Sequence, residues 1–451
     1  MKIKYYILLL LIFVIAACKP AIDEFSPQKG QADFTSYLAV GNSLTAGYAD
    51  GSLYKSGQDA SYANILSKQF ASVGGGSFKQ PDMVDDFGFG FDGILPAPKF
   101  VLGPSQDCMG EVSLAPVRAP VDVDMNNFTS VAAGGPYNNI GVPGAKTYHL
   151  LFDQYAALNP YYARFAPDQN TPVIHLTAAF DATFFTLWIG NNDLLGWASE
   201  GGASDSLTDP MQFGYFMDLI IKACIQNQPG AYEAAKGAVA NIPDITGIPF
   251  FTFMNSRVPY NGLVLSADTA ALLTQLYAMN GHPEITFQEG PNAWVVEKSN
   301  GSFGRMTEED MFIMTLPTDS MICFGMGVAN MFTFAPYPIP HRYILDKTEK
   351  WQVQQHVMAY NAIIYDLCTM YGLAHVDMYQ LMNETAYGVT YDGILFTNDF
   401  IQGNLFSLDG IHGTPTGNAV LANHFIEAIN KTYNAAVPLA IVSDYGAVVY
   451  P

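Results

Sequence analysis

Two short segments near opposite ends of the chain could supply the groups for acyl transfer. Ser43 follows the apolar run 37–40 in the stretch YLAVGNSLTAGYADG, and residues compatible with a helix come after it. If the run is a strand, the serine lies at the carboxyl edge of a sheet and at a helix N-terminus, where negative charge is favoured. That position suits a hydroxyl that attacks a carbonyl carbon. A serine after a glycine is also a common helix N-cap, so Ser43 alone does not decide between the two roles.

An aspartate and a histidine in SLDGIHGTPTGN, residues 407–418, have a spacing that allows them to act as a pair. Asp409 precedes His412 by three residues, and a single turn can bring the carboxylate to the imidazole Nδ1. This contact would fix the tautomer and leave Nε2 free to accept a proton. A surface loop that caps the following helix is the alternative interpretation of the same segment.

Two further segments contain groups that can stabilise an oxyanion. In LWIGNNDLLGW, residues 187–197, polar residues follow a predicted strand, and the Asn192 amide could donate a hydrogen bond to developing negative charge. In NNIGVPGAKTYHL, residues 138–150, Gly144 would let a ligand approach its backbone N–H, and 144–147 are expected to begin a helix. The Gly-Asn-Asn-Asp run in the first of these two segments is equally compatible with an ordinary turn.

In this order, the four segments resemble the signature blocks of the GDSL/SGNH hydrolase superfamily. GNSLTAG resembles the first block, VPGAKT the second, IGNND the third and DGIH the last, and together they span most of the chain. The resemblance implies a catalytic triad of Ser43, Asp409 and His412, with the serine as nucleophile. It also implies an oxyanion hole formed by Ser43, Gly144 and Asn192. The implied activity is hydrolysis of carboxylic esters, with no metal and no organic cofactor.

One position departs from the family pattern. The residue before the nucleophile is Asn42, where the family name carries aspartate, and this change removes a charge beside Ser43 but none of the implied catalytic groups. The competing α/β-hydrolase pattern is G-x-S-x-G, with the acid far from the histidine. It is disfavoured because Thr45 stands at the fifth position and the acid lies three residues before the histidine.

The substrate is less well determined than the chemistry. The Phe- and Met-rich stretch 312–334 could line a pocket for an acyl chain, which favours lipid or other acyl esters, or it could be the core of an insertion. A glycan O-acetyl esterase is the alternative within the family. A surface binding lipoprotein that has lost activity on the same fold is the alternative from another class.

Short apolar runs alternate with helix-like stretches from about residue 36 onward, a pattern typical of a parallel α/β sheet. Strands are predicted at 37–40, 182–190, 236–241 and 373–379, and amphipathic helices at 349–372 and 417–433. With the family resemblance, we expect a three-layer α/β/α sandwich around a central, mostly parallel, flavodoxin-like sheet. The regions 74–133 and 250–340 do not follow the alternation and are predicted to be insertions or a cap.

The N-terminus resembles the signal of a bacterial lipoprotein. Lys2 and Lys4 precede an apolar run that is too short to span a bilayer, and small residues lead to Cys18. The resemblance implies export, cleavage before Cys18 and lipidation of its thiol. Lys19 after the cysteine favours the outer membrane. The sequence does not decide between its periplasmic and its outward-facing side. A plain secretory signal with a chance cysteine is the alternative.

The expected organisation therefore has four parts. They are a signal peptide at 1–17, a polar tether at 18–35, the hydrolase domain at 36–436 and a C-terminal tail at 437–451, which could add an edge strand or pack on the surface.

The composition argues against nucleic acid as a partner and leaves the disulfides and the oligomeric state open. The 451 residues include 20 Lys and Arg against 41 Asp and Glu, and a net charge of -21 argues against nucleic-acid binding because nothing would neutralise phosphates. The remaining cysteines fit one or two disulfides about as well as free core thiols, and they show no zinc-site spacing. They are Cys108, Cys224, Cys323 and Cys368. The sequence does not indicate an oligomeric state.

Overall fold

The centre of the molecule is a five-stranded parallel sheet. The structure is a computed structural model that describes residues 25–225 and 234–450. The sheet order is β6-β1-β7-β8-β17. The strands are β1 (Tyr37–Gly41), β6 (Asn139–Gly141), β7 (Phe184–Trp188), β8 (Lys236–Ala240) and β17 (Ala374–Val376). Numbered along the chain, this order is 2-1-3-4-5, as in flavodoxin-like doubly wound sheets. The predicted parallel α/β architecture is therefore confirmed.

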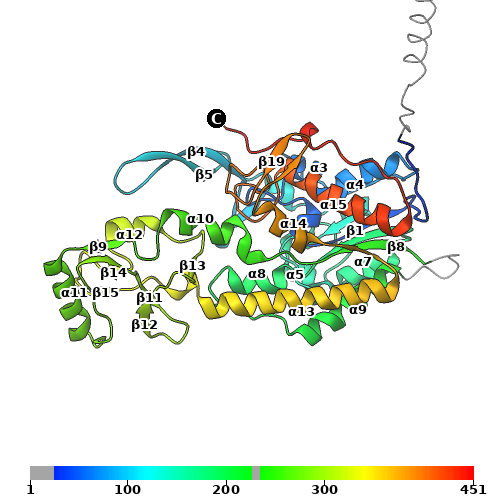
Figure 1. The fold of residues 1–451 in the computed structure, drawn as a ribbon. Helices are drawn as coiled ribbons and strands as arrows, with labels where there is room; N and C mark the ends of the chain where they lie inside the picture. The colour runs from blue at the N-terminus through cyan, green and yellow to red at the C-terminus, as the bar shows by residue number, and fades with distance from the viewer. Residues whose placement is uncertain (1–24, 226–233, 451) are drawn as a thin grey trace, which may run out of the picture.

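Helices cover both faces of this sheet (Figure 1). On one face α15 (Pro415–Tyr433) packs with α4 (Tyr62–Ala71), and on the other α13 (Lys347–Tyr371) packs with α8 (Asn192–Ala198) and α9 (Pro210–Ile225). Because both faces are covered, the central strands are largely apolar, and all five residues of β1 and of β7 are buried.

Both predicted amphipathic helices are present, and each begins two residues earlier than expected. The reason is that capping residues precede the apolar pattern. At the start of α13, the Asp346 carboxylate accepts hydrogen bonds from the N–H groups of Thr348 and Glu349, and the Glu349 carboxylate accepts one from the N–H of Asp346. Thr414 caps α15, whose first residue is Pro415.

The first predicted insertion, 74–133, forms two antiparallel hairpins. They pair β2 (Gly90–Asp92) with β3 (Leu95–Ala97) and β4 (Phe100–Gln106) with β5 (Val112–Arg118). The long β4–β5 hairpin extends over the side of the molecule where the second insertion lies (Figure 1). A disulfide joins Cys108 of this hairpin to Cys323 of α12 (Thr318–Phe324), so the two insertions are covalently connected.

The second insertion, 250–340, has a hydrophobic core of its own beside the sheet (Figure 1). Phe312, Met321, Met326 and Ile339 are buried in this core, apart from the larger cluster that surrounds the sheet. Its further helices are α10 (Pro249–Arg257) and α11 (Ala267–Met279). Its strand pairs are β9 (Leu263–Leu265) with β10 (Gly290–Asn292), β11 (Val295–Glu297) with β12 (Phe303–Arg305), β13 (Met311–Phe312) with β16 (Ile344–Leu345), and β14 (Val328–Ala329) with β15 (Pro336–Tyr337).

The N-terminal tether is shorter than predicted at its C-terminal end. The sequence predicts a polar tether over 18–35, but Ala32 and Phe34 are buried, and Gln28 pairs with Ala436. Burial of these apolar side chains fixes the chain on the domain before residue 36. The predicted signal peptide and Cys18 lie outside the described residues.

The C-terminal tail packs on the surface of the domain and adds no strand within its described part, 437–450. Val437 and Ala440 are buried, and their carbonyl groups accept hydrogen bonds from the side chains of Asn430 and Asn423 on α15. A search of the described part of the chain for helices long and apolar enough to cross a membrane finds none.

The two cysteines outside the disulfide are free thiols in the core. Cys224 lies on α9 and Cys368 on α13, and both are buried. Burial raises the pKa of the Cys368 thiol to about 12 and that of Cys224 further, so neither is a thiolate at neutral pH.

Candidate active site

Three strands bring the predicted site segments to one edge of the sheet. Gly41 at the end of β1 pairs with Gly141 of β6 and with Trp188 of β7, so the three strands end level. Ser43 lies just beyond β1, and Asn192 lies just beyond β7. This carboxyl edge is where doubly wound sheets bind their ligands.

Ser43 is the first residue of α2 (Ser43–Ala46), a single helical turn. The capping role belongs to Asn42, whose side chain accepts a hydrogen bond from the N–H of Leu44 at 3.1 Å. The Ser43 hydroxyl is therefore free for another partner. As the first residue of the turn, Ser43 also has a backbone N–H with no partner inside the helix.

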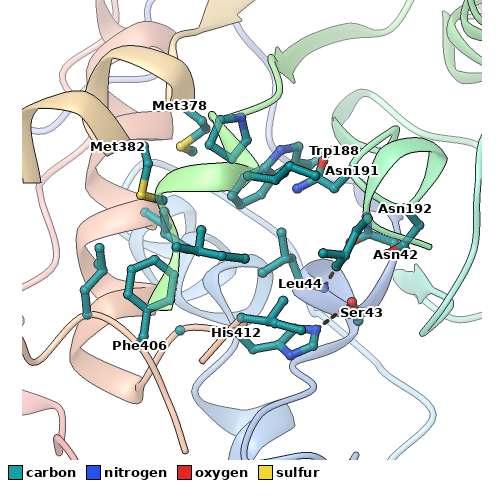
Figure 2. Close-up of a pocket in the computed structure, with 18 of the residues that line it drawn as sticks. Asn42, Ser43, Leu44, Trp188, Asn191, Asn192, Met378, Met382, Phe406 and His412 are labelled. Atoms are coloured by element: carbon teal, nitrogen blue, oxygen red, sulfur yellow. Dashed lines mark hydrogen bonds between the residues drawn. The ribbon is translucent and has the colours of Figure 1, made fainter. Parts of the chain in front are cut away.

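Ser43, His412 and Asp409 form a continuous chain of hydrogen bonds. His412 Nε2 lies 2.8 Å from Ser43 Oγ, and His412 Nδ1 lies 2.8 Å from Asp409 Oδ2 (Figure 2 shows the first contact). Ser43 is 8% and His412 9% exposed, so the contact between them is largely shielded from water. An imidazole held in this way carries its proton on Nδ1 and can accept one from the serine at Nε2.

The carboxylate of Asp409 is held by several donors besides the imidazole. Oδ1 accepts hydrogen bonds from the N–H groups of Ile411 and His412 at 2.9 Å and from the Ser407 hydroxyl at 3.1 Å, and Oδ2 accepts one from the N–H of Gly51 at 2.9 Å. Burial by itself would raise the pKa of this carboxyl. The charge of His412 and the hydrogen bonds outweigh burial and hold the pKa of Asp409 well below its usual range. Asp409 is therefore ionised at neutral pH.

Asp50, which was not predicted from the sequence, connects the Asp409 loop to the Ser43 segment. Asp50 Oδ1 accepts a hydrogen bond from the N–H of Leu408 at 3.0 Å, and the N–H of Asp50 donates to the Ser407 hydroxyl at 3.0 Å. Burial and, less strongly, the charge of Asp409 raise the pKa of the Asp50 carboxyl. The available signal was the Asp-Gly turn pair that begins at Asp50, although it does not reveal the partner.

Gly144 lies in a loop after β6, and the helix predicted over 144–147 is not present there. The loop leads instead into a 3-10 helix, Tyr148–Leu151. Gly144 has a φ of +78°, a left-handed conformation that favours glycine over other residues. Among the residues that the structure describes, none accepts a hydrogen bond from its N–H. Gly144 lines the same cleft as Ser43.

Hydrogen bonds connect the Gly144 loop to the start of α8. The Asn192 side chain donates a hydrogen bond to the carbonyl of Ala145 at 2.9 Å. Next to it, the buried carboxylate of Asp193 accepts hydrogen bonds from the N–H and the hydroxyl of Thr147, at 2.9 and 2.6 Å. The Gly-Asn-Asn-Asp run, for which the sequence also allowed an ordinary turn, therefore holds two possible oxyanion donors in fixed relative positions. These donors are the Gly144 N–H and the Asn192 amide.

Two cavities meet at Ser43. We call the first the narrow pocket: it has a volume of about 60 Å³ and runs from Ser43 and His412 toward Met378, Met382 and Phe406 (Figure 2). Its other lining residues are Asn42, Leu44, Trp188, Asn191, Asn192, Leu195, Pro243, Ile245, Ile248, Leu381, Leu405, Ile411, Gly413 and Leu421. Its polar residues are gathered at the Ser43 end, and the remainder of the lining is apolar.

The second cavity, the wide cleft, has a volume of about 730 Å³. Its walls include Phe100 and Arg118 from the first insertion and Phe253 and Met314 from the second. Of the two roles that the sequence left open for the stretch 312–334, the core of an insertion holds for most of it. Within it Met314 and Thr315 reach the cleft, whereas its buried Phe and Met side chains fill the core of the insertion, the alternative that the sequence left open.

The geometry permits nucleophilic chemistry at Ser43. His412 can take its proton, Asp409 is ionised and can stabilise the imidazolium, and the donors near Ser43 can stabilise negative charge. Among the described residues there is no group of three or more His, Cys, Asp and Glu side chains placed to hold a metal ion. No protein-family model matches the chain, and no curated protein matches it either.

Proposed function

We propose that the protein is a serine esterase of the GDSL/SGNH type that hydrolyses carboxylic esters through a covalent acyl-enzyme. The observation that carries this proposal is the Ser43–His412–Asp409 chain, with two contacts of 2.8 Å ending on a carboxylate whose pKa is depressed. The strand order of the sheet and the order of the four sequence blocks along the chain support the same proposal.

In the proposed reaction, Ser43 Oγ attacks the ester carbonyl while His412 Nε2 takes its proton. Negative charge on the carbonyl oxygen is stabilised by the N–H groups of Ser43 and Gly144 and by the Asn192 amide. The C–O bond to the alcohol then breaks, and the alcohol leaves with the proton from His412. Water attacks the acyl-serine by the same route: His412 accepts its proton, the carboxylic acid is released and Ser43 regains its hydrogen.

An active-site probe tests this proposal against a binding protein on the same fold. We expect a fluorophosphonate to label the purified protein at Ser43, because only an activated serine reacts with it. Ser43→Ala should abolish labelling and hydrolysis of p-nitrophenyl esters, whereas Ser72→Ala, at an exposed serine beyond the end of α4, should retain both. Failure of the wild-type protein both to label and to cleave p-nitrophenyl esters of any chain length would contradict the esterase proposal and favour an inactive binding lipoprotein.

We also propose that the protein is exported and anchored in the bacterial outer membrane through lipid on Cys18. The Cys108–Cys323 disulfide supports export independently of the leader, because disulfides persist in oxidising compartments. We expect Cys18→Ser to move the protein from the membrane fraction to the soluble fraction, and Ser43→Ala to leave it in the membrane fraction. A Cys18→Ser protein that stays in the membrane fraction would contradict the lipid anchor.

A further inference from the structure

The two cavities at Ser43 have contrasting shapes and linings. Both include Ser43, Asn192 and His412, so a substrate bound for attack could extend into either. Met378 of α14 (Met378–Thr385) and Phe406 lie at the far end of the narrow pocket, away from Ser43 (Figure 2), and further buried apolar side chains line the pocket, among them Leu381, Leu405 and Leu421. Met382, also on α14, is the partly exposed residue among the apolar groups at this end.

The wide cleft is open, and both insertions contribute to its walls. Phe91, Phe100 and Arg118 come from the first insertion, and the Arg118 guanidinium lies 3.9 Å from the centre of the Phe100 ring. Phe253 of α10 and Met314 come from the second insertion. The cleft therefore offers room and aromatic surface to a large group, whereas the narrow pocket offers a dry apolar slot.

We infer that the narrow pocket holds the acyl chain and the wide cleft holds the alcohol, so that the substrate is a short-chain acyl ester of a bulky alcohol. This assignment rests on the proposed esterase function. The first argument is the order of events at Ser43. After attack, the acyl carbon stays bonded to Ser43 Oγ, and the alcohol takes a proton from His412 and departs.

Water must then reach the same acyl carbon and pass its proton to His412. If the alcohol occupied the narrow pocket, it would be enclosed between buried side chains and the acyl-serine at the mouth. If it occupies the wide cleft, it can leave and water can enter by the same opening. The geometry thus favours retention of the acyl chain in the narrow pocket during both steps.

The second argument is size. The narrow pocket has a volume of about 60 Å³, against about 730 Å³ for the wide cleft. The narrow pocket therefore suits a short acyl chain, and the wide cleft suits the larger part of the substrate. Longer chains would meet Met382 and the buried residues beside it. Each carbon that fits or fails to fit in such a pocket is worth roughly 10- to 200-fold in kcat/KM.

The experiment compares esters of 4-methylumbelliferone with acyl chains from acetate to palmitate. We expect the kcat/KM of the wild-type protein to be highest for a short-chain ester and to fall toward the octanoate and the palmitate, because the narrow pocket is small. Met382→Ala should open the far end, so that kcat/KM for the octanoate rises about tenfold or more relative to the butanoate. Met370→Ala, at an exposed methionine of α13, is the matched control and should keep the wild-type profile.

A second variant tests the opposite assignment, in which the wide cleft holds the acyl chain and the narrow pocket holds the alcohol. Phe253→Ala, in the wide cleft, should raise KM by a similar factor for every acyl length, because it acts on the alcohol. The inference is overturned if the wild-type protein prefers chains of twelve or more carbons, or if Phe253→Ala changes the chain-length preference and Met382→Ala does not. A protein that cleaves none of the esters and does not react with a fluorophosphonate overturns the esterase proposal itself, and this assignment with it.

Discussion

Replacement of Asp409 by asparagine is expected to lower kcat for ester hydrolysis about 10⁴-fold, because the amide selects the wrong tautomer of the histidine. Oδ1 accepts hydrogen bonds from the N–H groups of Ile411 and His412, so an amide nitrogen placed there would face two backbone donors. Oδ2 accepts from one backbone donor, the N–H of Gly51, and from the imidazole. We therefore expect the NH₂ group at the Oδ2 position, where it donates to Nδ1. The ring proton then sits on Nε2, which cannot accept the proton of Ser43.

The measurement is kcat for a p-nitrophenyl ester, together with the rate of fluorophosphonate labelling, which should fall in parallel. The matched control is Asp310→Asn. Asp310 is also a buried carboxylate that accepts hydrogen bonds from two backbone N–H groups, those of Thr307 and Lys347, but it lies in the second insertion. Its variant should keep wild-type kcat. An Asp409→Asn protein with more than a tenth of wild-type kcat would show that His412 does not depend on this carboxylate.

The residues of the candidate site could be predicted because each of them depends on local structure. Ser43 follows a strand end, and Asp409 and His412 share one loop, so a short window of sequence contains the information that places each side chain. The sheet edge then brings these windows together, because parallel strands end on the same side. Each local pattern alone left an alternative open, and it was the resemblance of all four, in order, to the blocks of one family that indicated their roles.

The contacts between the windows could not be predicted in the same way. The hydrogen bonds between Asp50 and the segment around Leu408 join residues far apart in sequence, and an aspartate in a turn has many possible partners. The same holds for the disulfide between Cys108 and Cys323. Four cysteines without a spacing pattern do not identify the pair.

The role of the stretch 312–334 was left open for a related reason. A stretch rich in Phe and Met, such as 312–334, has the composition of a buried core and of an apolar ligand site alike. Here it forms the core of the second insertion. The narrow pocket is instead lined by single residues from separate segments, among them Leu44, Ile248, Met378 and Leu421, none of which stands out in its own segment. Only their packing in three dimensions identifies them.

Replacement of Asn192 by alanine is expected to lower kcat about 10²- to 10³-fold with little change in KM, the usual loss for one oxyanion donor. The Asn192 amide already donates one hydrogen bond, to the carbonyl of Ala145, and this bond fixes the amide plane beside the Gly144 loop. The second N–H of the Asn192 amide can then donate a hydrogen bond to the oxyanion without reorientation of the side chain. Because the charge on the carbonyl oxygen develops only in the transition state, the loss should appear in kcat.

The neighbouring amide provides the comparison that can contradict this assignment. Asn191 also lines the narrow pocket, and its buried Oδ1 has no hydrogen-bond partner among the described residues. If Asn191→Ala lowers kcat by the factor expected for Asn192→Ala, and Asn192→Ala does not, the oxyanion donor is Asn191. Asn192→Asp adds an independent test: the carboxylate has nearly the same shape but brings negative charge to the oxyanion, so its kcat should fall below that of Asn192→Ala. An Asp variant as active as the alanine variant would mean that position 192 does not face the developing charge.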